Sequence, residues 1–93
     1  SMVNRKPTYD LKMGDLVRIT DRAIQYEIVK GKPNVGVVVS EPYCYMTTEC
    51  EGPNVDAAMI ELEHWCYDIL FGNQITKMMP EEFIEPFVLP GSE

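Results

Sequence analysis

Basic residues are scarce over most of this chain. Beyond residue 36 the chain has one basic residue, Lys77, and eleven acidic residues. The formal net charge of the 93 residues is −7. Nucleic-acid binders neutralise phosphates with lysine and arginine, so this balance argues against a general nucleic-acid binder. The first 36 residues keep that alternative open, because they carry seven basic side chains against four acidic ones: Arg5, Lys6, Lys12, Arg18, Arg22, Lys30 and Lys32.

Long apolar stretches and a paired set of cysteines are also missing. No segment approaches the roughly 20 apolar residues of a membrane-spanning helix, and the first residues do not resemble a signal peptide. Ser1-Met2 resembles a tag remnant. The three cysteines, Cys44, Cys50 and Cys66, cannot all pair with one another. An odd count without a signal peptide indicates reduced thiols, so we expect a cytoplasmic protein with no membrane partner, its thiols buried as small hydrophobes.

The length supports one small domain with a single core. We expect a flexible arm over residues 1–10, a barrel domain over 11–89 and a tail over 90–93. Gly14-Asp15 is a turn signal ahead of a predicted strand at 16–20.

Two further segments lie in the first half of the chain, and the first of them has two interpretations. Residues 21–30 fit either a helical turn or a strand, because their apolar residues satisfy both periods. The valine-rich segment 35–40 predicts a strand that is buried on both faces or nearly so.

A hairpin is predicted after that strand. Residues 43–50 alternate aromatic and small side chains as an extended limb would, and residues 55–63 would return as the second limb. A helix over 56–63 is the competing interpretation, because the segment contains good helix formers and a capping residue. We favour the hairpin, since Ile60 and Leu62 alternate with acidic residues.

The remaining sequence predicts a closing set of short strands. Residues 65–71 read as a strand with four large side chains on one face: Trp65, Tyr67, Ile69 and Phe71. Gly72-Asn73 predicts a tight turn into a partner strand at 74–78. Residues 80–83 predict one helical turn that begins with proline, and 84–87 an edge strand because of Pro86.

Three sequence segments carry a resemblance to a known fold. They are Leu11-x-x-Gly14-Asp15-x-Val17, then Val35-Gly36-Val37-Val38, and Tyr67-Asp68-Ile69-Leu70-x-Gly72-x-Gln74-Ile75 followed by Pro80-Glu81-Glu82-Phe83-Ile84-Glu85. Over residues 11–88 the pattern resembles the SH3-like small β-barrel and the short uncharacterised accessory proteins of large tailed bacteriophages. The resemblance implies a mainly β, SH3-like small barrel of about five strands, with a projecting hairpin or short helix inserted around residues 43–63.

Candidate catalytic and metal-binding residues are few. Cys44, Cys50, His64 and Cys66 have the composition of a zinc site, but an extended 43–50 would separate its two thiols by about 20 Å. We therefore expect no metal and no cofactor. His64, Cys66 and Asp68 share one strand face, which we interpret as a solvated stripe rather than a catalytic triad. The expected protein is accordingly not an enzyme.

An interaction surface on the hairpin is the favoured functional hypothesis. Tyrosine is common at binding hot spots, whereas Trp65 and Tyr67 read more simply as core. Methionines 46, 59, 78 and 79 suit an adaptable contact surface but are more often core. The predicted partner-binding residues are Tyr43, Tyr45, Glu49, Glu51, Glu61 and Glu63.

Two functions remain open at this point. The first is a non-enzymatic protein-binding module, which the resemblance places among phage accessory proteins that engage a host or phage protein in the host cytoplasm. The second is a structural, virion-type component that forms homo-oligomers through strand edges.

Overall fold

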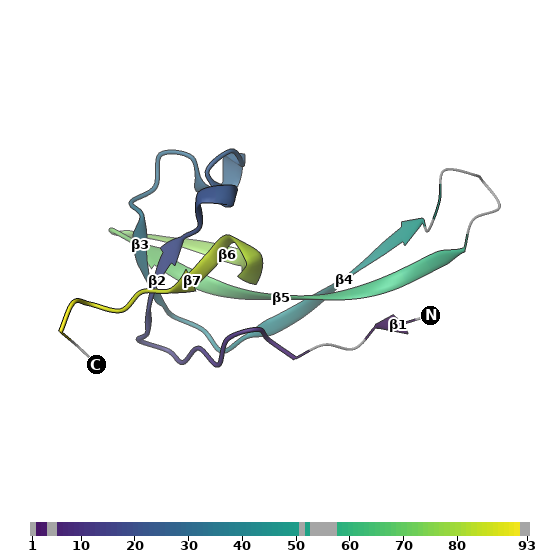
Figure 1. Cartoon of the computed structure of the whole chain (residues 1–93), viewed down its shortest axis with the longest axis horizontal. Coiled ribbons are helices and arrows are strands. Elements are labelled where there is room, and N and C mark those ends of the chain that lie inside the picture. The colour runs from purple at the N-terminus through teal and green to yellow at the C-terminus, as the bar shows by residue number, and fades with distance from the viewer. Residues whose placement is uncertain (1, 4–5, 51, 53–57, 92–93) are drawn as a thin grey trace.

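The computed structural model describes residues 2–3, 6–50, 52 and 58–91, and this part of the chain is mainly β (Figure 1). Five strands curl into a half-barrel in the order β6-β5-β3-β2-β7, which confirms the prediction of a small barrel-like fold. No helix among these residues is long and apolar enough to cross a membrane. The strands are β1 (Met2–Val3), β2 (Leu16–Ile19), β3 (Val35–Val38), β4 (Tyr43–Cys50), β5 (Met59–Phe71), β6 (Gln74–Pro80) and β7 (Ile84–Pro86).

Strand β5 runs through the whole molecule and belongs to two parts of it. Its C-terminal half lies between β3 and β6, whereas its N-terminal half pairs with β4 on one edge and with β1 on the other. The sequence predicted two strands, at 55–63 and at 65–71. From Met59 onward the structure has one continuous strand, so the prediction of two separate strands is wrong. No glycine or proline interrupts residues 59–71, so one strand of 13 residues can continue.

The hairpin prediction is confirmed for residues 43–50 and 59–63, and the competing helix is wrong from Met59 to Glu63. Residues 55–57, where both predictions began, lie outside the part of the chain that the structure describes. Strands β4 and β5 pair antiparallel from Tyr43↔Cys66 to Cys50↔Met59. This pair, which we call the ribbon, extends away from the half-barrel (Figure 1) and gives the molecule its length, with principal extents of 52 × 26 × 22 Å.

The hydrophobic core fills the inner face of the half-barrel. Every second residue of β2, and of β5 from Tyr67 to Phe71, is buried, as a strand with one buried face requires. Gly36 of β3 lies in close contact with β5: a Cβ atom at this position would sit 2.6 Å from Ile69 Cγ2. The buried hydrophobic residues are Leu11, Val17, Ile19, Ala23, Val29, Val38, Cys66, Tyr67, Ile69, Phe71, Met79 and Ile84.

Two predictions in the first half of the chain can be compared with the structure. Of the two interpretations of residues 21–30, the helical turn is confirmed and the strand is wrong, because the segment forms two short 3-10 helices, η1 (Asp21–Ala23) and η2 (Glu27–Val29). Ala23 and Val29 are buried and anchor this segment, Ile28 packs partly buried against the core, and Ile24 and Tyr26 are exposed. Strand β3 is fully buried on one face only, because the outer face of the half-barrel is open to solvent.

The C-terminal elements follow the prediction closely. Pro80 ends β6, and the 3-10 helix η3 (Glu81–Phe83) leads into β7. Strand β7 pairs with β2 and stands at one end of the strand order. Proline has no N–H to donate to a neighbouring strand, and Pro86 is tolerated here because β7 pairs with one strand only among the described residues.

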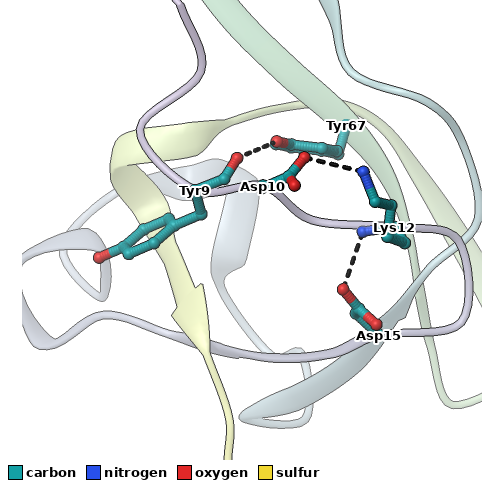
Figure 2. Close-up of polar contacts among 5 residues, drawn as sticks. All are labelled: Tyr9, Asp10, Lys12, Asp15 and Tyr67. Carbon is teal, nitrogen blue, oxygen red and sulfur yellow. Dashed lines mark hydrogen bonds and ion pairs between the residues drawn. The ribbon is translucent and has the colours of Figure 1, made fainter.

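Part of the predicted arm is held against the barrel. The Tyr67 hydroxyl donates to the carbonyl oxygen of Tyr9 at 3.2 Å (Figure 2). Three residues further on, the Lys12 N–H donates to Asp15 Oδ2 at 2.8 Å, and Lys12 Nζ lies 2.9 Å from Asp10 Oδ1 (Figure 2). On the arm itself, the Thr8 N–H donates to Glu81 Oε2 at 2.8 Å. These bonds position the start of the barrel domain.

Candidate protein-interaction surface

The ribbon has two faces, defined by the alternation of side chains along its strands. The Tyr45 face carries the odd-numbered residues of β4 opposite the even-numbered residues of β5: Tyr43, Tyr45, Thr47, Glu49, Ile60, Leu62, His64 and Cys66. The Met46 face carries the others: Cys44, Met46, Thr48, Cys50, Met59, Glu61, Glu63 and Trp65.

Contacts within the Tyr45 face hold its central side chains. The Tyr45 and His64 rings stack with their centroids 5.0 Å apart and an interplanar angle of 18°. Thr47 Oγ1 and His64 Nε2 form a hydrogen bond of 2.6 Å. Burial raises the pKa of Tyr45, with a further contribution from the negative charge of Glu82. These three side chains form a partly buried cluster.

A hydrogen-bond network joins the base of the ribbon to the barrel. The Tyr43 hydroxyl donates to Asp68 Oδ1 at 2.5 Å and accepts from the Met78 N–H at 2.9 Å. Met78 has a φ of 56°, and the β5–β6 register shifts between Tyr67 and Ile69, which marks a β-bulge at this point. The bulge turns the Met78 N–H toward the tyrosine.

The same network changes the acidity of its central group. Burial, followed by the hydrogen bond to Asp68, raises the pKa of Tyr43 to about 12. The phenol therefore stays protonated at neutral pH and remains the donor to the carboxylate. Tyr43 acts as a structural link as well as a half-buried side chain of the Tyr45 face.

The predicted solvated stripe His64, Cys66 and Asp68 is wrong at its centre. Cys66 is fully buried because it pairs with Tyr43 of β4 on one side and with Pro80 of β6 on the other. Its thiol donates to the Tyr43 carbonyl oxygen at 3.3 Å, and burial raises the pKa of Cys66. A thiol held protonated in this way is a poor nucleophile.

The four candidate zinc ligands are not brought together. Cys44 and Cys50 lie exposed on the Met46 face, whereas His64 and Cys66 lie on the Tyr45 face. Within the described residues, no group of three or more histidine, cysteine or acidic side chains has the arrangement of a metal site. The expectation that the thiols are buried is therefore wrong for Cys44 and Cys50.

Five of the six predicted partner-binding residues lie in the described part of the chain, and they are divided between the two faces. Tyr43, Tyr45 and Glu49 lie on the Tyr45 face, and Glu61 and Glu63 lie on the Met46 face. Glu51 falls outside the described residues. The two tyrosines are half-buried, so their rings are only partly available to a partner.

The most exposed apolar side chains of the ribbon are ones that the sequence reasoning ranked lower. Met46 is 43% exposed and Met59 is 56% exposed, both on the Met46 face. Met78 is also exposed, whereas Met79 is completely buried in the core. The alternation of side chains along a strand could have indicated which methionines are exposed, but applying it requires the strand boundaries.

The ribbon and the first half of the chain differ in their charged residues. Between Tyr43 and Phe71 the sequence has six acidic residues and no lysine or arginine. In the first half of the chain, by contrast, three basic side chains already face an acid: Lys12 faces Asp10, Arg18 faces Glu85 and Lys30 faces Glu27. This local pairing weakens the case for phosphate binding by that half.

The surface clefts of the barrel are small. One, of about 250 Å³, is lined by apolar Ile24 and Phe87 together with Arg18 and Asp21. Typical small-molecule sites enclose roughly 300–1,000 Å³. The ribbon is therefore the more extensive candidate surface.

Comparison with known proteins gives no relative: no family model, no curated protein and no solved structure matches the chain.

Proposed function

We propose that the protein is a non-enzymatic protein-binding module, and that the ribbon is its binding element. The observation that carries the proposal is the projection of a regular two-stranded ribbon beyond the barrel, with Met46 and Met59 exposed on one face. Exposed methionines suit contact surfaces because their side chains adapt to the shape of a partner. A ribbon placed outside the core can present them without disturbing the barrel.

The cytoplasm is the compartment that we propose, because the thiols of Cys44 and Cys50 are exposed. Exposed thiols persist in reducing compartments and are prone to oxidation elsewhere. The sequence resemblance supports a phage-encoded accessory protein that acts in the cytoplasm of its host.

The test compares two lysine substitutions at exposed apolar positions. Met46→Lys alters the ribbon, and Ile24→Lys alters a barrel loop where the side chain is 58% exposed. Each variant is used to capture proteins from a lysate of the cells in which the protein is naturally made. Loss of the captured partner with Met46→Lys but not with Ile24→Lys supports the proposal. The reverse result would place the binding surface on the barrel.

Self-assembly is the second candidate function, because strand β4 has a neighbour on one side only among the described residues. Two β4 strands could pair about a two-fold axis and join two ribbons. The net charge of −7 on each copy opposes this association at low salt. Size-exclusion chromatography with light scattering, at low and high salt, measures it: a stable dimer would favour the structural function over the binding module.

A further inference from the structure

The outer edge of β4 is open to another strand. Among the described residues, β4 pairs with β5 alone, over eight residue pairs and without a register shift. Proteins commonly protect such edges with lysine, proline or a bulge. The segment Tyr43–Cys50 contains no lysine and no proline, and its pairing has no bulge. Its outward N–H and C=O groups can therefore form a further ladder.

The opposite edge of the ribbon already accepts an added strand. Strand β1 pairs in parallel with β5, with Met2 opposite Glu61 and Val3 opposite Leu62. The sequence that follows β1 includes Arg5 and Lys6. An extended segment, Met2–Val3, thus already lies against this acidic ribbon within the chain itself.

Charge complementarity indicates the chemistry of a strand that would add to β4. Glu49 on the Tyr45 face and Glu61 on the Met46 face are both exposed, and no lysine or arginine lies between Tyr43 and Phe71. An added strand would lie about 5 Å from β4 and about 10 Å from β5. A long basic side chain beside Thr48, which pairs with Glu61, could extend across this small residue toward the carboxylate.

Resting on the function proposed above, we propose that the partner contributes an extended, lysine- or arginine-rich segment that adds to the free edge of β4. Main-chain hydrogen bonds supply the affinity in this mode of recognition, and alternate side chains supply the specificity. The basic side chains of the segment lie on the Met46 face near Glu61. The residues between them lie on the Tyr45 face, beside the ring of Tyr45, where apolar or β-branched side chains fit.

The test uses the peptide acetyl-Lys-Val-Lys-Thr-Lys-Val-Lys-Thr-amide and the intact protein. Amide hydrogen exchange is followed by NMR with and without the peptide. Slower exchange at about every second residue of β4 is expected, because alternate N–H groups point toward the open edge. Binding should weaken as salt is raised, since its charge contribution is screened.

Two control peptides and two protein variants test strand addition and charge recognition separately. Replacing the two central residues of the peptide by proline removes ladder donors, and replacing every lysine by glutamate reverses the charge. We expect neither control to protect β4. Glu61→Gln should weaken binding of the lysine peptide about two- to five-fold, as for an exposed charge pair. The matched substitution Glu27→Gln, at an exposed acid on the barrel, should leave it unchanged.

Several results would overturn the inference. Binding of the lysine peptide without protection of β4 would exclude strand addition, and equal binding of the glutamate peptide would exclude the charge class. No binding of the lysine peptide at millimolar concentration would exclude both. Protection of the outward N–H groups of β4 in the free protein, together with a dimeric mass, would assign the edge to a second copy. Failure of the proposed function is recognised separately, by a captured partner that Met46→Lys does not affect.

Discussion

The two halves of β5 share one backbone but have opposite surroundings. From Tyr67 to Phe71 the odd-numbered side chains are buried in the barrel core, whereas Met59 at the other end is more than half exposed. The C-terminal half is enclosed by β3, β6 and the loops around them, and the N-terminal half has only β4 and the short β1 beside it. A strand of uniform geometry can therefore stabilise the fold at one end and present a surface at the other.

The largest expected effect compares two truncations on this one strand. Ile69→Ala removes a fully buried side chain, so we expect a loss of about 2–5 kcal/mol in the free energy of unfolding. Met59→Ala, on the exposed half, should change it by less than about 0.5 kcal/mol. Chemical denaturation of both variants measures the difference. Equal losses would show that the ribbon is as tightly packed as the barrel.

The junction between the two regions should respond to a smaller change. Tyr43→Phe removes the hydroxyl that donates to Asp68 and accepts from the Met78 N–H. We expect a loss of about 1.5–3 kcal/mol in the free energy of unfolding, the usual contribution of a hydrogen bond to a charged group. Thermal and chemical denaturation at pH 7 provide the measurement. An unchanged stability would mean that the ribbon is not anchored through this hydroxyl.

The pH dependence of stability gives a second, graded test of the junction. The pKa of Tyr43 is raised from 10.0 to about 12 in the folded protein. Its stabilising contribution is therefore fully present below pH 10 and is lost as the pH rises toward 12. The advantage of the wild type over Tyr43→Phe should shrink across this range, as unfolding curves at pH 8, 10 and 11.5 would show. A constant difference between the two proteins would contradict the raised pKa.

The smallest expected effect is a difference in thiol labelling between the ribbon and the buried base of the ribbon. Cys44 and Cys50 are exposed on the ribbon, whereas Cys66 is buried where β4 and β6 both meet β5. A thiol reagent should label two cysteines in the native protein and the third only after unfolding, as mass spectrometry would count. Rapid labelling of all three would show that the base of the ribbon opens readily.

The period-two pattern of the sequence was sufficient to predict the small barrel and to assign side chains to strand faces. Ile60 and Leu62 correctly indicated a strand limb, and His64 and Cys66 were correctly placed on one face. The alternation does not say what covers a face, which is why the face that carries His64, Cys66 and Asp68 was interpreted as solvated, although burial was expected of the thiols by residue type. Its burial depends on Pro80 and Tyr43, residues distant in sequence that meet it only in the folded sheet.

The predicted site depended on the same missing information. Choosing tyrosines and glutamates by residue type gave six residues, and the ribbon divides the five described ones between its two faces. The Tyr43–Asp68 bond joins residues 25 positions apart, and no local pattern encodes it. The open edge of β4 follows from the absence of a neighbouring strand among the described residues, which strand pairing alone reveals.

The central claim is that a protein partner meets this molecule on the ribbon rather than on the barrel. Photo-crosslinking tests it most directly, with a benzophenone side chain placed at Met46 in one variant and at Ile24 in another. Both positions are exposed apolar sites, so the reactive group is accessible in each variant. We predict a discrete protein adduct from position 46 and none from position 24. An adduct from position 24 alone would contradict the account.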